Sequence, residues 1–562
     1  MSPTFRVVLL ASALLKLLLA LEFARLAPRY DEVDFLAFGE RTAAVGRTDL
    51  FRAPGYQVFV ALGLTLGGGP IGVRLLQVLV SVATSLVVYR SLRRLAGERA
   101  ALAGGAFVAF YPSHVAFSHL LWAETLFLLP VVGAFDRLLA ADSRGSWRTA
   151  GLAGVLLGVA SLVRSVGVVL LAASCVWLLW PRRRQLAPVA ALAGGAALVI
   201  LPWSIHASSR AGRPMLIDGN AGYNLFSGNN RWIPPGLQGT WSLGLGLGNG
   251  VEETRAAQLR RKGASPELAW IAPEAGWRIE VEREMRAAGI ADPESFAAAD
   301  WFRDHALREI VRDPIGALAR IPLKLSCWWA PDFFLPRHLL RDWYGPLPRP
   351  IGAGVAALAM LASAVPLLLG PAALAALPRS RFRSLALAWL ASAALIHALT
   401  FAVSRMHQPF VPLLAMAVCL AWLDPGGASP PRRLVRRGLP VLGLALATWI
   451  LSAPAVFGLY LSPGPRYAAL ARVLGVLGET SLPAARHATW MRARVVAAAG
   501  DEREAERLLA RSRHAELPWT LFERALVAEP GEMRPLLERA FDAGPIVGYE
   551  AESLRARMPE AR

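Results

Sequence analysis

The sequence has few of the residues that carry charge, disulfides or metal ions in soluble proteins. Charged residues make up only 18% of its 562 residues, and 3 of the 60 basic residues are lysine. Three cysteines, Cys175, Cys327 and Cys419, are too few and too scattered for a disulfide framework or a zinc site. No glycine-rich nucleotide-binding loop is evident. The low charge excludes the several soluble domains that the length alone would suggest.

Long apolar runs are abundant instead. Hydrophobic residues make up 55% of the chain, and the mean hydropathy is +0.41. They form uncharged runs such as 186–205 and the longer 351–378. A run of about 20 apolar residues is long enough for a helix to cross a hydrocarbon core of roughly 30 Å. The sequence therefore predicts a mainly α, polytopic helical membrane protein.

The net charge of +19 comes almost entirely from arginine in short loops between apolar runs. This distribution argues against nucleic acid as a partner, because nucleic-acid binding needs a basic face on a folded domain. Short basic loops of membrane proteins lie in the cytoplasm. We therefore place five of them there: 89–99, 143–148, 181–185, 378–383 and 430–438.

The apolar stretches between these loops predict helical hairpins and about eleven spans. The first run contains Lys16 and lacks a small-residue cleavage site, so we interpret it as an uncleaved span. An odd number of spans puts the N-terminus in the cytoplasm and the C-terminus outside. The predicted spans are 7–23, 71–92, 100–116, 119–136, 149–163, 165–180, 186–205, 351–377, 384–403, 409–423 and 438–461.

Two domains are expected. Residues 1–462 form the membrane domain, with external loops at about 24–70 and 206–350. Within the second loop, residues 300–334 have helical apolar spacing with Arg320, Lys324 and paired tryptophans, which predicts an amphipathic helix in the outer interface. Residues 463–562 are charge-balanced and helical in pattern, and form a small helical domain, with a tetratricopeptide-like helix pair as one interpretation.

Ionisable residues gather at the predicted outer ends of the spans. A charge at mid-bilayer costs on the order of 3 kcal/mol or more, so such residues are functional candidates. A channel would place ionisable residues throughout the depth of the bilayer. A cluster of such residues on one face of the membrane instead favours a reaction with a lipid-borne substrate. The candidates at the hairpin tips are Arg164, Arg405, His407, His114, His119 and Glu124, and the first loop adds Asp31, Glu32, Asp34, Glu40 and Arg52.

Each candidate also has a structural interpretation. Asp31 and Glu32 could act on a nucleophile as a general base or could cap a helix N-terminus. Arg52 could bind phosphate or extend to the headgroup level, and Arg164 and Arg405 could bind phosphate or close hairpin tips. The segment 218–232, rich in Gly, Asn and Tyr, could bind a hydroxyl-rich ligand or form plain turns.

The order of these motifs resembles a known family. "DE" at 31–32 follows the first span, "RAPGY" lies at 52–56, and "FYPSHVAFSHLLWAETLF" covers 110–127. "LLGVASLVRS", "GYNLFSGNN" and "SRMHQPFVPLL" follow. Over about residues 1–425 the chain is similar to the GT-C glycosyltransferases that use polyprenyl-phosphate sugars, such as protein O-mannosyltransferases and bacterial aminoarabinose transferases.

The resemblance implies an inverting sugar transfer from a polyprenyl phosphate, undecaprenyl phosphate in a bacterium, at the periplasmic face of the inner membrane. Asp31 would be the general base, Glu32 would support it, and Glu124 would position the acceptor or a metal. Arg52, Arg164 and Arg405 would hold the donor phosphate. The other residues that we assign to substrate binding are Tyr56, Tyr223, Asn229, Asn230, Lys324 and His407.

The implied partners are the donor, membrane lipids and an acceptor that is a lipid, a glycan or a protein. The resemblance implies no definite cofactor and leaves a divalent cation, Mg²⁺ or Mn²⁺, as a candidate. Arg52 stands where the aminoarabinose branch has a lysine, so the acceptor does not carry over from that branch. Two alternatives are a transporter of lipids or lipid-linked sugars, which would need more polar groups at mid-bilayer, and a scaffold that binds partners through its tail.

Overall fold

The computed structural model of the chain is helical throughout its described residues, and no strand occurs among them. The chain folds into two compact units. Unit 1 comprises residues 1–220, 331–396 and 404–447, and unit 2 comprises 221–330, 397–403 and 448–562. The described residues are 1–26, 31–144, 146–180, 186–230, 284–290, 295–332, 335–336, 339, 348–423, 434–460, 501–511, 521, 524–525 and 528–543.

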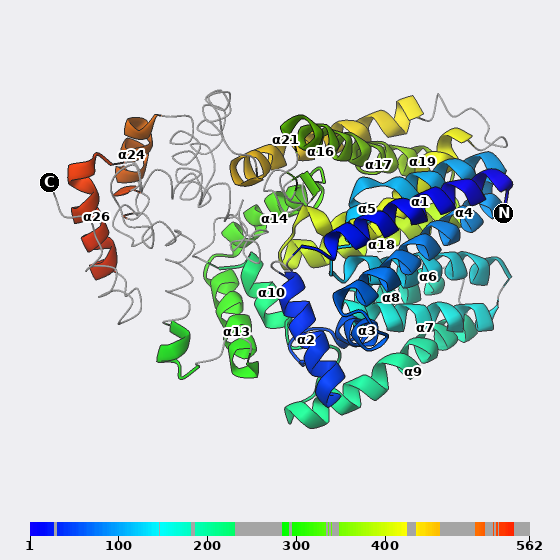
Figure 1. Ribbon diagram of the computed structural model, residues 1–562, viewed down its shortest axis with the longest axis horizontal. Helices are drawn as coiled ribbons and strands as arrows, with labels where there is room; N and C mark the ends of the chain where they lie inside the picture. Colours follow the sequence, from blue (N-terminus) through cyan, green and yellow to red (C-terminus); the bar gives the residue numbers. More distant parts are fainter. Residues whose placement is uncertain are drawn as a thin grey trace. The chain divides into compact units, whose positions relative to one another are not determined.

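The helices of unit 1 correspond to the predicted spans and include two further helices in the first external loop (Figure 1). Pro54–Thr65 (α3) is shorter than a membrane span and lies within the predicted external loop 24–70. The helices of the first half are α1 Pro3–Phe23, α2 Asp31–Val45, α3, α4 Pro70–Phe110, α5 Pro112–Phe117, α6 Glu124–Arg144, α7 Trp147–Val163, α8 Gly167–Leu179 and α9 Leu186–Ala211.

The later part of unit 1 contains the remaining spans. The predicted span 351–377 is continuous but changes its pitch, because a π-helical segment containing Pro366 joins two α-helices. The elements are α16 Arg349–Ala364, η4 Val365–Leu369, α17 Gly370–Ala376, α18 Arg381–Leu399, η5 Ser404–Phe410, α19 Val411–Leu423, η6 Leu434–Gly438 and α21 Leu439–Tyr460. Unit 1 includes α18 up to residue 396 and α21 up to residue 447.

The long helix α4 covers two predicted spans and breaks between them. Gly97 has φ 82° and ψ −172°, a conformation that glycine adopts without a steric penalty. Near this break Asp136 of α6 accepts a hydrogen bond from Ser91 and pairs with Arg94 and Arg137. The basic stretch 89–99 thus contains a helix break, and hydrogen bonds and ion pairs connect it to α6. A break at this position fits the predicted loop between two spans.

Small residues allow α7 and α9 to pack closely. A methyl group added to Gly154 would overlap the backbone of Leu192, and one added to Gly195 would overlap the carbonyl oxygen of Gly151. Glycine and alanine at such interfaces let transmembrane helices approach each other backbone to backbone. Gly194, the neighbour of Gly195, faces open space.

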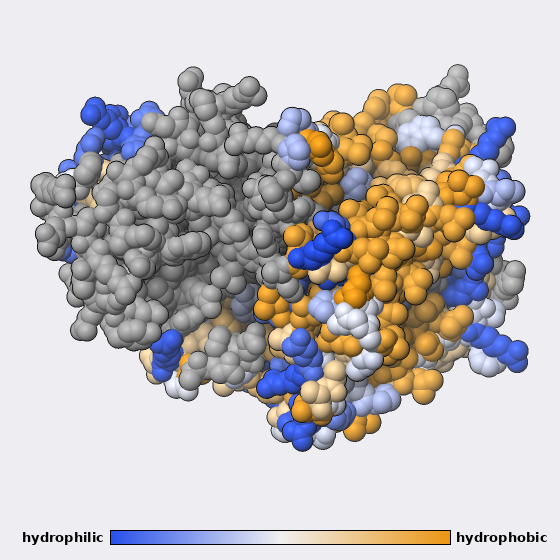
Figure 2. Space-filling model, viewed as in Figure 1, coloured by the Kyte–Doolittle hydropathy of each residue, from blue (hydrophilic) through white to orange (hydrophobic). Residues whose placement is uncertain are grey.

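The outer surface of unit 1 is apolar. Large side chains are exposed along α1, at Leu10, Leu14 and Leu18, and along α9, at Leu198 and Ile205. Figure 2 shows this apolar surface, with hydrophilic residues at its edge near the N-terminus. Exposed apolar helix faces of this extent are what lipid contact requires.

Six described helical segments are long and apolar enough to cross a membrane, and α7 and α8 are shorter apolar helices. The chain is therefore a multi-pass helical membrane protein. The count of eleven spans and the orientation of the termini stay predictions. The six segments are Pro3–Phe23, Pro70–Phe110, Leu186–Ala211, Pro350–Ala376, Arg381–Leu399 and Ser404–Leu423.

Unit 2 contains the predicted amphipathic segment as two helices. The side chain of Ser295 caps α13 (Phe296–Arg312), and that of Asp313 caps α14 (Pro314–Trp328). Val311, Ile315 and Leu318 are exposed, as an interfacial helix would need. Unit 2 also contains α10 (Ala221–Gly228), α24 (Glu502–Ala510) and α26 (Pro530–Ala543). Most of the tail lies outside the described residues, so its tetratricopeptide-like character stays a prediction.

Candidate active site

Asp31 is the first residue of α2, and its side chain is partly exposed. Its carboxylate oxygen Oδ2 accepts a hydrogen bond from Nη1 of Arg405 at 3.1 Å. Asp31, Glu32 and Asp34 all lie in the first turn of α2, where the helix dipole favours negative charge. This position fits the helix-cap interpretation, and Asp31 in addition pairs with a residue 374 positions away.

Arg405 connects this carboxylate to a second one. It lies in η5, its Cζ is 4.4 Å from the centroid of the Trp122 ring, and its Nε is 3.9 Å from Oε1 of Glu124. Stacking on Trp122 holds the guanidinium plane in place by a cation–π contact. A guanidinium has five N–H donors, so Arg405 can hold two acids and still bind a phosphate oxygen.

Glu124 and Arg164 form the other side of the site. Glu124 is the buried first residue of α6, and Arg164 immediately follows α7 with an extended backbone. The side chain of Arg164 donates to Oε1 of Glu124. Arg164 does end a helix, as the hairpin-tip interpretation expects, but its guanidinium points to an acid on another span. The structure thus brings Asp31, Glu124, Arg164 and Arg405 together.

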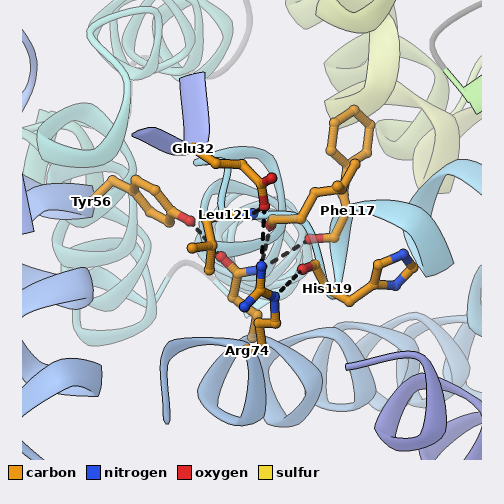
Figure 3. Close-up of polar contacts among 8 residues, drawn as sticks. Glu32, Tyr56, Arg74, Phe117, His119 and Leu121 are labelled. Carbon is orange, nitrogen blue, oxygen red and sulfur yellow. Dashed lines mark hydrogen bonds and ion pairs between the residues drawn. The ribbon is translucent and has the colours of Figure 1, made fainter. Parts of the chain in front are cut away.

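Glu32 lies apart from this group. Its side chain is buried, forms an ion pair with Arg74 at 3.5 Å and accepts a hydrogen bond from the backbone N–H of Leu121 at 3.0 Å (Figure 3). Successive residues of a helix point in different directions, so adjacent acids need not share a site. Any support that Glu32 gives to Asp31 must pass through these contacts.

Arg52 and Tyr56 have their own partners. Arg52 pairs with Asp34 at 3.0 Å, and its Cζ lies 5.6 and 5.5 Å from the ring centroids of Phe35 and Phe38. Tyr56 is buried and donates its hydroxyl to Gln77 at 2.5 Å. Burial and the charges of Glu32 and Glu124 raise the pKa of Tyr56 well above its usual range. These contacts indicate a role for Tyr56 in packing beneath the site.

His407 faces the interior and is fully buried beside Gln408. Gln408 donates to Oδ2 of Asp332, which also accepts the Tyr111 hydroxyl at 3.2 Å. This polar cluster anchors η5, the segment that carries Arg405. A direct substrate contact of His407 would require this packing to open.

The remaining predicted residues belong to unit 2. Asn229 donates to the carbonyls of Leu225 and Leu399, and Asn230 donates to the carbonyl of Phe226. Tyr223 packs edge-on against Phe302. The described part of the segment is not a plain turn, because residues 221–228 form the helix α10 and the two asparagine amides donate to carbonyls of its last turn.

Lys324 is a buried cation in unit 2. It donates to Oδ1 of Asn229 at 2.9 Å and to the carbonyl of Ala398 at 3.1 Å. Burial, with a contribution from the charge of Arg320, lowers the pKa of Lys324 to about 7.

A divalent cation finds no matching ligand set in the described residues. Among them no group of three His, Cys, Asp or Glu side chains could hold a metal ion. The two acids of the site, Glu124 and Asp31, are each paired with a guanidinium. A metal there would have to displace these arginines.

Sequence reasoning missed Arg74, Gln77 and Trp122. Arg74 offered a signal, because it interrupts the apolar run 71–92 as Arg164 interrupts 149–180. Trp122 offered none, because a tryptophan near the end of a span is ordinary in membrane proteins.

The comparisons with known proteins bear on residues 52–206, which match the family model "Dolichyl-phosphate-mannose-protein mannosyltransferase". The matched segment contains Arg52, Glu124 and Arg164, and Asp31 and Arg405 lie outside it. No curated protein matches this chain.

Solved structures with a similar trace include ArnT from Cupriavidus metallidurans bound to undecaprenyl phosphate, at 16% identity and a TM-score of 0.36, over 86% of this chain and 82% of that one. The oligosaccharyltransferase AglB from Archaeoglobus fulgidus, in complex with an inhibitory peptide and a dolichol-phosphate, has 15% identity and a TM-score of 0.38 over 87% of this chain and 60% of its own. The similarity to the mannosyltransferase family thus covers residues 52–206, and the structure shows a multi-pass helical membrane protein.

Proposed function

We propose that the protein transfers a sugar from a polyprenyl phosphate to an acceptor hydroxyl at the periplasmic face of a bacterial inner membrane, with inversion at the anomeric carbon. The observation that carries the proposal is the convergence of two acids and two arginines from four separate segments: Asp31, Glu124, Arg164 and Arg405. Such a set can both activate a hydroxyl and stabilise a leaving phosphate.

Asp31 serves as the general base. It takes the proton of the acceptor hydroxyl while that oxygen forms a bond to the anomeric carbon. The bond from the anomeric carbon to the phosphate oxygen breaks in the same displacement, on the opposite side of the carbon, and this geometry inverts the configuration. A partly exposed carboxylate at a helix N-terminus, held by Arg405, is accessible for this role.

Arg405 and Arg164 stabilise the leaving group. The products are the glycosylated acceptor and a polyprenyl phosphate monoester, which carries the electron pair of the broken bond as negative charge. Prearranged guanidinium groups stabilise developing charge without reorganisation at the moment of reaction. Glu124 keeps both guanidinium groups in place, and it is also close enough to the site to orient an acceptor hydroxyl.

A transfer assay in nanodiscs tests the proposal directly. The purified protein is given a panel of synthetic polyprenyl-phosphate sugars with envelope extracts as acceptor, and release of polyprenyl phosphate is followed by mass spectrometry. We expect the protein to consume at least one polyprenyl-phosphate sugar of the panel. We expect it not to consume nucleotide sugars. Movement of a lipid-linked sugar between leaflets without cleavage would instead support the transporter alternative and overturn the proposal.

A further inference from the structure

Arg74 is a buried charge that the proposed chemistry does not use. It lies in the first turns of α4, and 2% of its side chain is exposed. A buried guanidinium is tolerated only when its charge and its N–H donors are matched by partners. Its partners therefore indicate what the residue does.

Those partners come from two segments that both lead into the site. Nε of Arg74 donates to the carbonyl of His119 at 2.9 Å, and Nη2 lies 3.5 Å from Oε1 of Glu32. The same Oε1 atom accepts the N–H of Leu121 at 3.0 Å (Figure 3). Arg74 and Glu32 together thus hold both a carbonyl and an N–H of the turn between α5 and α6.

Gln77, three residues further along α4, extends this framework. Its Nε2 donates to the carbonyls of Phe117 and Leu120, at 3.2 and 2.7 Å, and its Oε1 accepts the hydroxyl of Tyr56. Some N–H groups of this turn bond to backbone carbonyls, whereas the carbonyl of His119 and the N–H of Leu121 bond to side chains. Arg74 of α4 and Glu32 of α2 provide these side chains.

The two ends of the framework adjoin the proposed catalytic groups. Glu32 follows Asp31 directly, and the turn contains Trp122, on which Arg405 stacks, and leads into Glu124, the first residue of α6. We propose that Arg74 is a positioning residue: it sets the distance between Asp31 and the Trp122–Glu124 side of the site without touching substrate. This inference rests on the proposed role of Asp31.

The expected size of the effect follows from the precision that group transfer needs. A misplacement of reacting groups by about 1 Å can cost roughly 100-fold in rate. Arg74→Gln removes the ion pair with Glu32, and the shorter glutamine side chain does not extend as far toward the carbonyl of His119. We therefore expect kcat to fall about 10- to 100-fold and the donor KM to change less than about 3-fold. Arg74→Lys keeps the charge and should restore part of kcat.

Glu32→Gln provides a second, gentler test. Its amide oxygen can still accept the Leu121 N–H, while the charge facing Arg74 is lost. We expect a smaller loss of kcat than in Arg74→Gln. The double variant Arg74→Gln/Glu32→Gln should be no slower than Arg74→Gln alone, because both substitutions disable the same contact.

The matched control is Asp136→Asn, which breaks the ion pairs of the buried Asp136 carboxylate with Arg94 and Arg137. Asp136 lies twelve residues beyond Glu124 on α6, roughly 18 Å along the helix. This variant should lower the Tm and leave kcat per folded molecule unchanged.

The outcomes separate the two proposals. Equal kcat in wild type and Arg74→Gln, with only the Tm lowered as in Asp136→Asn, would overturn the positioning role and leave the proposed function intact. No transfer by folded wild-type protein would overturn the proposed function itself. If Arg74→Gln does not fold, the variants Glu32→Gln and Arg74→Lys test the positioning role instead. An unchanged kcat in both variants would contradict the inference.

Discussion

Adjacent acids in this protein have different environments. Asp31 is partly exposed and held by Arg405, whereas Glu32 is buried against Arg74 and the Leu121 N–H. A general base must reach its substrate, and a buried ion pair must keep both partners. The sequence motif "DE" therefore combines an accessible carboxylate, Asp31, that can act as a general base with a buried carboxylate, Glu32, that stabilises the structure around it.

Arg405→Lys tests the bridging role of the guanidinium. A lysine ammonium cannot lie flat on Trp122 and bond two carboxylates and a phosphate in one plane. We expect kcat/KM for the donor to fall about 100-fold or more, in the range seen when one donor to a developing charge is removed. Arg25→Lys is the control, because Arg25 forms only an exposed ion pair with Glu22. Equal kcat/KM values for the donor in Arg405→Lys and the wild type would contradict the bridging role of Arg405.

Lys324 gives a prediction for pH dependence. Its pKa is lowered to about 7 by burial, so its positive charge is present below that pH and is lost as the pH rises. The donor is a phosphodiester whose charge is constant over this range. If Lys324 contributes to donor binding, donor KM should rise between about pH 6 and pH 8 in the wild type. Lys324→Arg stays charged, so its donor KM should stay flat; parallel pH profiles would contradict the assignment.

Much of the site could be predicted from residue order. Asp31, Glu124, Arg164 and Arg405 were recognisable because an ionisable group beside an apolar span is costly and needs a reason. Their pairing could not be predicted, because it depends on how segments up to 374 residues apart pack. Tyr56 and His407 have suitable chemistry for substrate contact, but a sequence does not show that both are buried.

At the scale of elements, helix positions follow hydropathy closely and helix breaks follow glycine and proline. The spans predicted at 149–163 and 186–205 correspond to α7 and α9, within a few residues at most ends. The short helix α3 and the break at Gly97 depend on packing and backbone conformation, which hydropathy does not record.

Neighbouring glycines on α9 test the close packing of α7 on α9. Gly195→Ala would push a methyl group into the Gly151 carbonyl, an overlap that typically costs roughly 1–3 kcal/mol. Gly194→Ala adds a methyl group in open space and favours the helix. We expect Gly195→Ala to lower the Tm in detergent and Gly194→Ala to keep or raise it. Equal Tm values in the two variants would contradict the packing.

At the scale of the whole molecule, a membrane unit presents charged groups from α2, α6, η5 and the end of α7. Hydropathy and arginine distribution were enough to predict a multi-pass helical protein, because the bilayer permits few alternatives. The division into two units was not predictable, since residues 397–403, the end of the predicted span 384–403, group with 221–330.

The most direct test of the account compares Asp31→Asn with Asp34→Asn in the nanodisc transfer assay. Both substitutions remove one carboxylate from the first turn of α2, but Asp34 pairs with Arg52 and not with Arg405. Loss of a general base costs about 10²- to 10⁴-fold in rate. We predict a loss of that size in kcat for Asp31→Asn, at unchanged Tm, and a rate within a few-fold of wild type for Asp34→Asn. Full transfer by folded Asp31→Asn protein would contradict the central claim.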